Sequence, residues 1–212
     1  IGSTIGQRFH LSAKDIHIVT MCGMRGVFSA LFGTPITATI FSMEVISVGV
    51  LYYVAFIPCF LSSVIAYSFA NYFGVAPETY QLLHIPSLTI PTMIRIGILA
   101  GLCALVSIGF CVTIHKFHSF FKSAFKNPYI RVLVGSVLLV LLTMLVGTYD
   151  YNGAGMHIVA NALEGKASQP FAFLLKIIFT AITLAAGFKG GEIVPSFFIG
   201  ATFGSVAGSL LG

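Results

Sequence analysis

Long apolar runs separated by short breaks rich in glycine, proline and polar residues dominate the chain. A helix that crosses a bilayer needs about 20 apolar residues, and several runs approach that length. The pattern predicts about seven hydrophobic helices and one short amphipathic helix, which fall at residues 14–32, 34–48, 51–69, 92–114, 129–146, 156–163, 171–186 and 196–211. We therefore predict an all-α integral membrane protein, a single transmembrane domain over residues 1–212.

Two of the predicted helices, 34–48 and 196–211, are short, and each begins at a polar break that contains a proline. Pairs of short, interrupted helices indicate a transport site near the bilayer midplane that is built from inverted repeats. The pattern thus favours a multi-helix bundle with short, broken helices, a fragment of an inverted-repeat architecture.

Composition agrees with the membrane interpretation. Of the 212 residues, 57% are hydrophobic and 8% are charged, whereas soluble domains carry about 25% charged residues. The net charge of +5 is typical of the positive-inside rule and does not indicate nucleic-acid binding. We expect a basic connector at about 115–128, with Lys116, Lys122 and Lys126, on the cytoplasmic side. The four cysteines (Cys22, Cys59, Cys103 and Cys111) form no CxxC pair, which favours free thiols in apolar surroundings over a disulfide framework or a metal site.

The most polar interruption runs from Gly187 to Pro195. Irregular backbone at membrane depth must be buried in protein or line a water-filled cavity. Gly190 and Gly191 allow the backbone to approach a small ligand closely, and Pro195 suits the first turn of a helix. The N–H groups and the dipole of a helix amino end favour an anion. This segment therefore predicts a broken helix that holds a small anion.

Three segments carry a resemblance to a known family. Residues 190–195 (GGEIVP), followed by 198–201 (FIGA) and Gly204, resemble a signature of the CLC chloride channels and anion/proton antiporters. Residues 30–36 (ALFGTPI) and 41–44 (FSME) resemble a second one, and Asn152–Gly155 and Lys176 fit the region between. The resemblance covers the whole chain and about the middle half of a family member. It implies a homodimer with one anion pore per subunit, in which the N–H groups of Glu192, Ile193 and Val194 face the anion.

Two positions bear on the transported ion. Glu192 stands where most members have an apolar residue, and Val45 stands where the family places a proton-transferring glutamate. Both features resemble the fluoride-exporting branch, so we expect fluoride/proton antiport. The alternative is a chloride channel or chloride/proton antiporter. The family's other pore loops are expected outside residues 1–212, so a fragment that inserts and dimerises without conducting is a further alternative.

The charged residues have two interpretations each. Glu192 either carries protons or stabilises its own helix end, paired with Lys189. Glu44 lines a water-filled vestibule or hydrogen-bonds to a neighbouring helix. Lys176 and Lys189 attract anions, or such a side chain caps a buried carbonyl or reaches the interface. We expect no catalytic residue, metal or cofactor. The expected partners are the lipid bilayer, a second copy, a small inorganic anion and protons, and the expected location is a bacterial cytoplasmic membrane.

Overall fold

The computed structural model describes the chain except residues 1, 46–52, 78–86, 88, 166–168 and 212. The described residues form two compact units, Ile1–Thr79 (unit 1) and Tyr80–Gly212 (unit 2), and their boundary falls at the proline-containing segment 71–91 where the sequence breaks between helices. The single transmembrane domain over residues 1–212 stays a prediction, which this division into units does not test.

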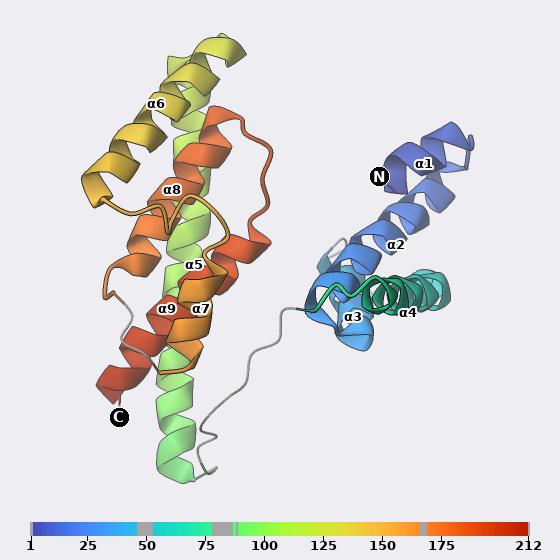
Figure 1. The fold of residues 1–212 in the computed structure, drawn as a ribbon, viewed down its shortest axis with the longest axis horizontal. Helices are drawn as coiled ribbons and strands as arrows, with labels where there is room; N and C mark the ends of the chain where they lie inside the picture. Colours follow the sequence, from blue (N-terminus) through green and yellow to red (C-terminus); the bar gives the residue numbers. More distant parts are fainter. Residues whose placement is uncertain (1, 46–52, 78–86, 88, 166–168, 212) are drawn as a thin grey trace. The chain divides into compact units, whose positions relative to one another are not determined.

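Every regular element in the described ranges is helical (Figure 1). Unit 1 contains α1 (Gly2–Arg8), α2 (Ala13–Phe32), α3 (Pro35–Val45), the 3₁₀ turn η1 (Tyr53–Ala55) and α4 (Phe56–Tyr72). Unit 2 contains α5 (Ile90–Ala124), α6 (Pro128–Val146), α7 (Met156–Leu163), α8 (Ala172–Ala186) and α9 (Ile193–Leu211). Among the described residues, four segments are long and apolar enough to cross a membrane, namely Tyr53–Tyr72, Ile90–Ala124, Pro128–Val146 and Ile193–Leu211. The predicted all-α membrane fold is confirmed.

In unit 1 the break between α2 and α3 lies where the sequence predicted it. Gly33 adopts a left-handed conformation with φ of 67°, and its N–H donates to the carbonyl of Ser29 at 2.9 Å. A side chain at this position would also come within 2.9 Å of Pro77. Pro35 then starts α3, where its missing N–H costs nothing. Glycine and proline together therefore end one helix and start the next within two residues.

Unit 2 is organised around α8, which packs against α5, α6 and α9 (Figure 1). Its buried residues include Phe179, Ala181 and Ala186. A Cβ on Gly135 of α6 would come within 2.2 Å of the Ala186 Cβ, so glycine is required where these two helices cross. Small residues permit such close approach in membrane helices, and the short helix α8 is thereby enclosed by its longer neighbours.

The predicted basic connector at 115–128 is mostly helix, because α5 continues through Ala124. The apolar stripe of α5 continues at helical spacing through Phe110, Ile114 and Phe121, which are all buried. Phe121 packs with Ala185 and Ala186. Exposed lysines alternate with the apolar residues of this stripe, and for that reason the sequence pattern predicted a connector here. The real connector is short, because Asn127 caps α6 by accepting a hydrogen bond from the Tyr129 N–H at 2.9 Å.

Candidate functional site

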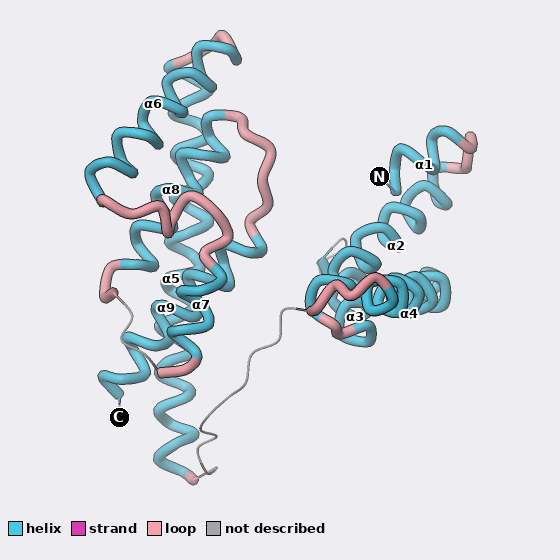
Figure 2. The backbone as a smooth tube through the Cα atoms, viewed as in Figure 1, coloured by secondary structure: helices cyan, strands magenta, loops and turns pink. Residues whose placement is uncertain are grey.

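The break between α8 and α9 forms the centre of the candidate site. Gly187 ends α8 with φ of 99°, and α9 begins at Ile193, three residues before the predicted start at 196. The carbonyl of Glu192 accepts the N–H of Ser196 at 3.0 Å, so Glu192 is the residue just outside the helix. Figure 2 shows the intervening loop as a pink segment between the two helices.

The first turn of α9 presents two N–H groups. Ile193 and Val194 occupy the first two helical positions, whose N–H groups have no acceptor within their own helix. Pro195 follows and has no N–H to offer. The backbone beside them is bare, since a Cβ on Gly191 would meet nothing within 4 Å and one on Gly190 would touch only Leu184. Two donors and the positive end of a helix dipole therefore lie beside open space.

The charged residues of this loop are exposed. Both Lys189 and Glu192 have exposed side chains, and within the described residues no salt bridge joins them. The pairing with Lys189 is therefore not formed, and both interpretations of Glu192, as a proton carrier and as a group that stabilises its own helix end, stay predictions. The other candidate acid, Glu44, lies in α3 next to Val45, but its side chain is outside the described residues.

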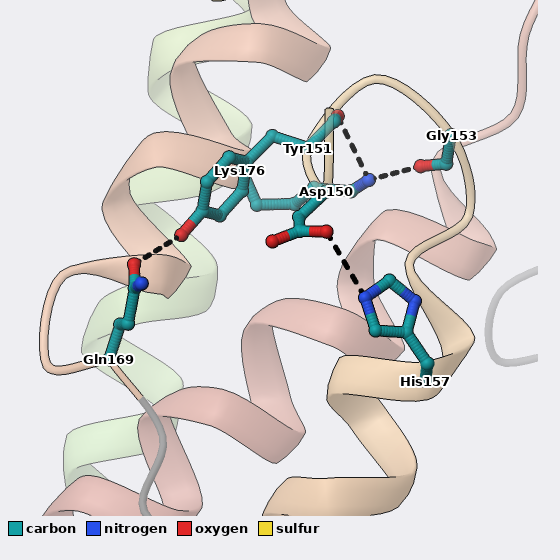
Figure 3. Close-up of polar contacts among 6 residues, drawn as sticks. All are labelled: Asp150, Tyr151, Gly153, His157, Gln169 and Lys176. Carbon is teal, nitrogen blue, oxygen red and sulfur yellow. Dashed lines mark hydrogen bonds and ion pairs between the residues drawn. The ribbon is translucent and has the colours of Figure 1, made fainter. Parts of the chain in front are cut away.

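Lys176 of α8 does not project into open space. Its side chain is 2% exposed, and its amino group donates to the carbonyl oxygen of Tyr151 at 3.2 Å and to that of Gly153 (Figure 3). The same nitrogen lies 4.9 Å from the centre of the Phe198 ring, which adds a cation–π attraction. Lys176 therefore caps two backbone carbonyls, one of them on the buried Tyr151, as one of the interpretations from the sequence had it.

Tyr151 extends this arrangement toward α9. It is 3% exposed, and its ring centre lies 5.7 Å from that of Phe179 and 6.0 Å from that of Phe198. Burial raises the pKa of the Tyr151 phenol, with a smaller contribution from Asp150. The phenol thus stays protonated and donates to Gln169 Oε1 at 3.0 Å (Figure 3).

Gly155 completes the contact between this loop and α9. It is left-handed, with φ of 68°, and a Cβ there would come within 2.6 Å of the Phe198 ring. Phe198 is fully buried and lies little more than one turn from the start of α9. The loop between α6 and α7, held by Lys176, therefore fixes the amino end of α9, where the N–H groups of Ile193 and Val194 have no acceptor within the helix.

One further pair lies at the edge of this loop. His157 Nε2 of α7 is 3.2 Å from Asp150 Oδ1, and both side chains are partly exposed, at 63% and 38% (Figure 3). Sequence reasoning missed Asp150, Tyr151, His157 and Gln169. A tyrosine near the end of an apolar run resembles an interfacial residue, and only the Asn152–Gly155 turn gave a signal that this loop matters.

Comparison with known proteins identifies the family of the chain. The family model for the voltage gated chloride channel matches residues 1–212. The chain belongs to this CLC family. A curated relative, the "Chloride/fluoride channel protein" of Pseudomonas syringae pv. tomato, is 28% identical over 212 residues, which is 96% of this chain and 46% of the relative. The "Putative ion-transport protein YfeO" of Escherichia coli is 24% identical over 196 residues, covering 87% of this chain and 45% of that protein.

A solved structure supports the same assignment. The crystal structure of a CLC-type fluoride/proton antiporter matches with a TM-score of 0.90 and 29% sequence identity, covering all of this CLC chain and 54% of that one. The chain spans about half the length of the relatives it matches. The CLC resemblance seen in the sequence motifs is therefore confirmed, and it concerns part of a family member's length.

Proposed function

We propose that this CLC chain forms part of a membrane pore domain that transports small halide anions, and that fluoride exchanged for protons is the transported pair. The observation that carries the proposal is the amino end of α9. The N–H groups of Ile193 and Val194 lack helical acceptors, and beside them Gly190 and Gly191 leave the backbone open. Fixed backbone dipoles of this kind replace the hydration shell of a small anion.

Glu192 supports fluoride over chloride. It lies immediately before α9 with an exposed side chain, so it can take up a proton next to the bound anion. A carboxylic acid donates a strong hydrogen bond to a small, hard anion such as fluoride. The name of the Pseudomonas relative mentions both chloride and fluoride, and the matching crystal structure is that of a fluoride/proton antiporter, which supports this choice. Glu44 in α3 is the second acid we propose for a vestibule.

We further propose that the protein works as a homodimer in a bacterial cytoplasmic membrane. Lys176 takes part indirectly, by fixing the loop that positions α9. Lys189, with its exposed ammonium group four residues before α9, raises the local anion concentration.

Liposome efflux tests the function. The natural gene product that contains this chain is reconstituted, and fluoride and chloride release are followed with ion-selective electrodes while external pH is recorded. We expect fluoride to leave faster than chloride and to drive protons inward. Equal rates for the two anions would favour the chloride transporter. If the gene product conducts and residues 1–212 alone do not, these residues form the non-conducting fragment.

A further inference from the structure

Two thiols face each other across the contact between α2 and α4. Cys22 Sγ and Cys59 Sγ are 3.4 Å apart, with Cys59 fully buried and Cys22 partly exposed. The two helices are held at this level by the Ser62 hydroxyl, which donates to the Cys22 carbonyl at 2.9 Å. Gly26, one turn further along α2, packs within reach of Ala66. The sulfur atoms are therefore kept in contact by the packing of their helices.

A buried cation lies next to these thiols. Arg25 is 0% exposed, and its guanidinium group interacts electrostatically with both Cys22 and Cys59. None of its three side-chain nitrogens has a hydrogen-bond partner among the described residues. Burial of an unpaired charge is costly, so an anion that forms beside Arg25 is stabilised. Cys22 and Cys59 are the groups with which Arg25 interacts electrostatically, and a cationic neighbour favours reaction at a cysteine that is partly exposed, as Cys22 is.

We propose that Cys22 and Cys59 form a modification site, in which a hydroperoxide joins them as a disulfide that links α2 to α4. The partly exposed Cys22 thiolate attacks the peroxide oxygen, the O–O bond breaks, and the hydroxide or alkoxide that leaves takes up a proton. Cys22 is then a sulfenic acid. The Cys59 sulfur attacks the Cys22 sulfur while its thiol proton passes to the departing hydroxide, so the S–S bond forms, the S–O bond breaks and water leaves. The thiols lose two electrons and the peroxide gains two.

Arg25 assists both steps, because its buried cation attracts the negative charge that develops on the reacting sulfur and oxygen atoms. Closing a disulfide requires the sulfur atoms to approach to about 2.05 Å, a small movement from their present contact. The product fixes the spacing between α2 and α4. Since α2 runs directly into the Gly33–Pro35 break that starts α3, the bond restrains the unit in which that break lies. This site is independent of the proposed transport function.

The test uses the two other cysteines as its background. The Cys103→Ser/Cys111→Ser variant removes the two other cysteines of residues 1–212, both in α5 of unit 2, and retains Cys22 and Cys59. It is titrated with hydrogen peroxide, denatured without reductant, and labelled with a maleimide reagent. We expect both labels to be lost together, a peptide that joins Cys22 to Cys59 within one chain, and full recovery of labelling after dithiothreitol. Retained labelling, cross-links between chains, or sulfinic acid as the main product would each overturn the proposal.

Variants of Arg25 test the cation. We expect Arg25→Gln to slow disulfide formation about tenfold, in line with the effect of a cationic neighbour on thiolate population, and Arg25→Lys to restore most of the rate. Both are compared after size-exclusion chromatography has shown a folded protein. An unchanged rate in a folded Arg25→Gln protein would remove Arg25 from the proposal. If Arg25→Gln does not fold, the Arg25→Lys rate decides, because a retained cation must keep the reaction fast.

Discussion

Lys176 shows how a buried charge in this chain is held without an acid. Its amino group donates to two backbone carbonyls and lies over an aromatic ring, so its hydration is replaced by dipoles that the fold already supplies. The side chain thereby ties α8 to the loop that carries Tyr151 and Gly153. The free-energy cost of burying the Lys176 charge is offset by these contacts, which order the loop between α6 and α7 that packs against α9.

Replacing Lys176 by Met is therefore expected to destabilise the protein. The change leaves the carbonyl oxygen of the buried Tyr151 without this donor, at about 1–3 kcal/mol, and also removes a hydrogen bond from the carbonyl of the exposed Gly153. A lower midpoint of thermal unfolding in detergent is the expected result. Lys189→Met is the matched control, since Lys189 is exposed and its loss leaves no such carbonyl. If Lys176→Met lowered anion flux with no change in unfolding, Lys176 would act through its field and not through the loop.

Gly155 and Gly153 form a second matched pair in the same loop. Gly155→Ala puts a methyl group within 2.6 Å of Phe198 on a backbone with φ of 68°, and overpacking with left-handed strain costs about 2 kcal/mol or more. Gly153→Ala meets nothing within 4 Å and is expected to be nearly neutral. Thermal unfolding of the two variants side by side gives the comparison. Equal midpoints would mean that the loop does not press on α9.

At the scale of elements, the length of α5 is decided by one apolar face. The stripe that ends in Phe121 packs on α8, while the lysines of the same turns are exposed. The number of charged residues alone suggests a connector, because such a count does not separate the two faces of a helix. Apolar residues that recur every three or four positions indicate a buried helix face even where the opposite face is charged.

Two neighbouring phenylalanines test this account of α5. Phe121 is 3% exposed and Phe120 is 64% exposed. Phe121→Ala opens a cavity against α8 and is expected to cost about 3–5 kcal/mol, whereas Phe120→Ala is expected to change stability little. Unfolding midpoints in detergent compare them directly. A larger loss at Phe120 would mean that this turn of α5 presents its other face to the protein.

The amino end of α9 can be altered one donor at a time. Ile193→Pro removes the first N–H, and proline is well tolerated at the first helical position, so α9 should persist. We expect slower fluoride efflux from liposomes that contain the natural gene product. Ile193→Ala removes most of the side chain and keeps the N–H, so it should transport nearly as the parent does. If both variants lost flux equally, the side chain and not the backbone donor would matter.

At the scale of the whole molecule, local and distant features differ in how far the sequence reveals them. Gly33–Pro35 and Gly187–Pro195 could be recognised as breaks because glycine and proline act on their own backbone. The partners of Lys176 lie 23 and 25 residues away, and Cys22 meets Cys59 across 37 residues. Such contacts depend on how helices cross. Because a membrane helix carries apolar side chains on every face, its sequence does not show which face contacts another helix. The anion-site residues themselves remain a prediction from motif and helix start.

Glu192 gives the prediction that decides the mechanism of the whole protein. Its carboxylate lies just before α9 with no salt-bridge partner among the described residues, so it can exchange protons with water. Glu192→Gln keeps a polar side chain of similar size but binds no proton. In liposomes with a fluoride gradient, we expect proton uptake to stop in this variant and to persist in Glu192→Asp. Thermal unfolding is measured in parallel, because a carboxylate at a helix amino end also stabilises the helix. A variant that is less stable but still drives protons would assign Glu192 to the helix end, and the proton path would then have to run through another acid such as Glu44.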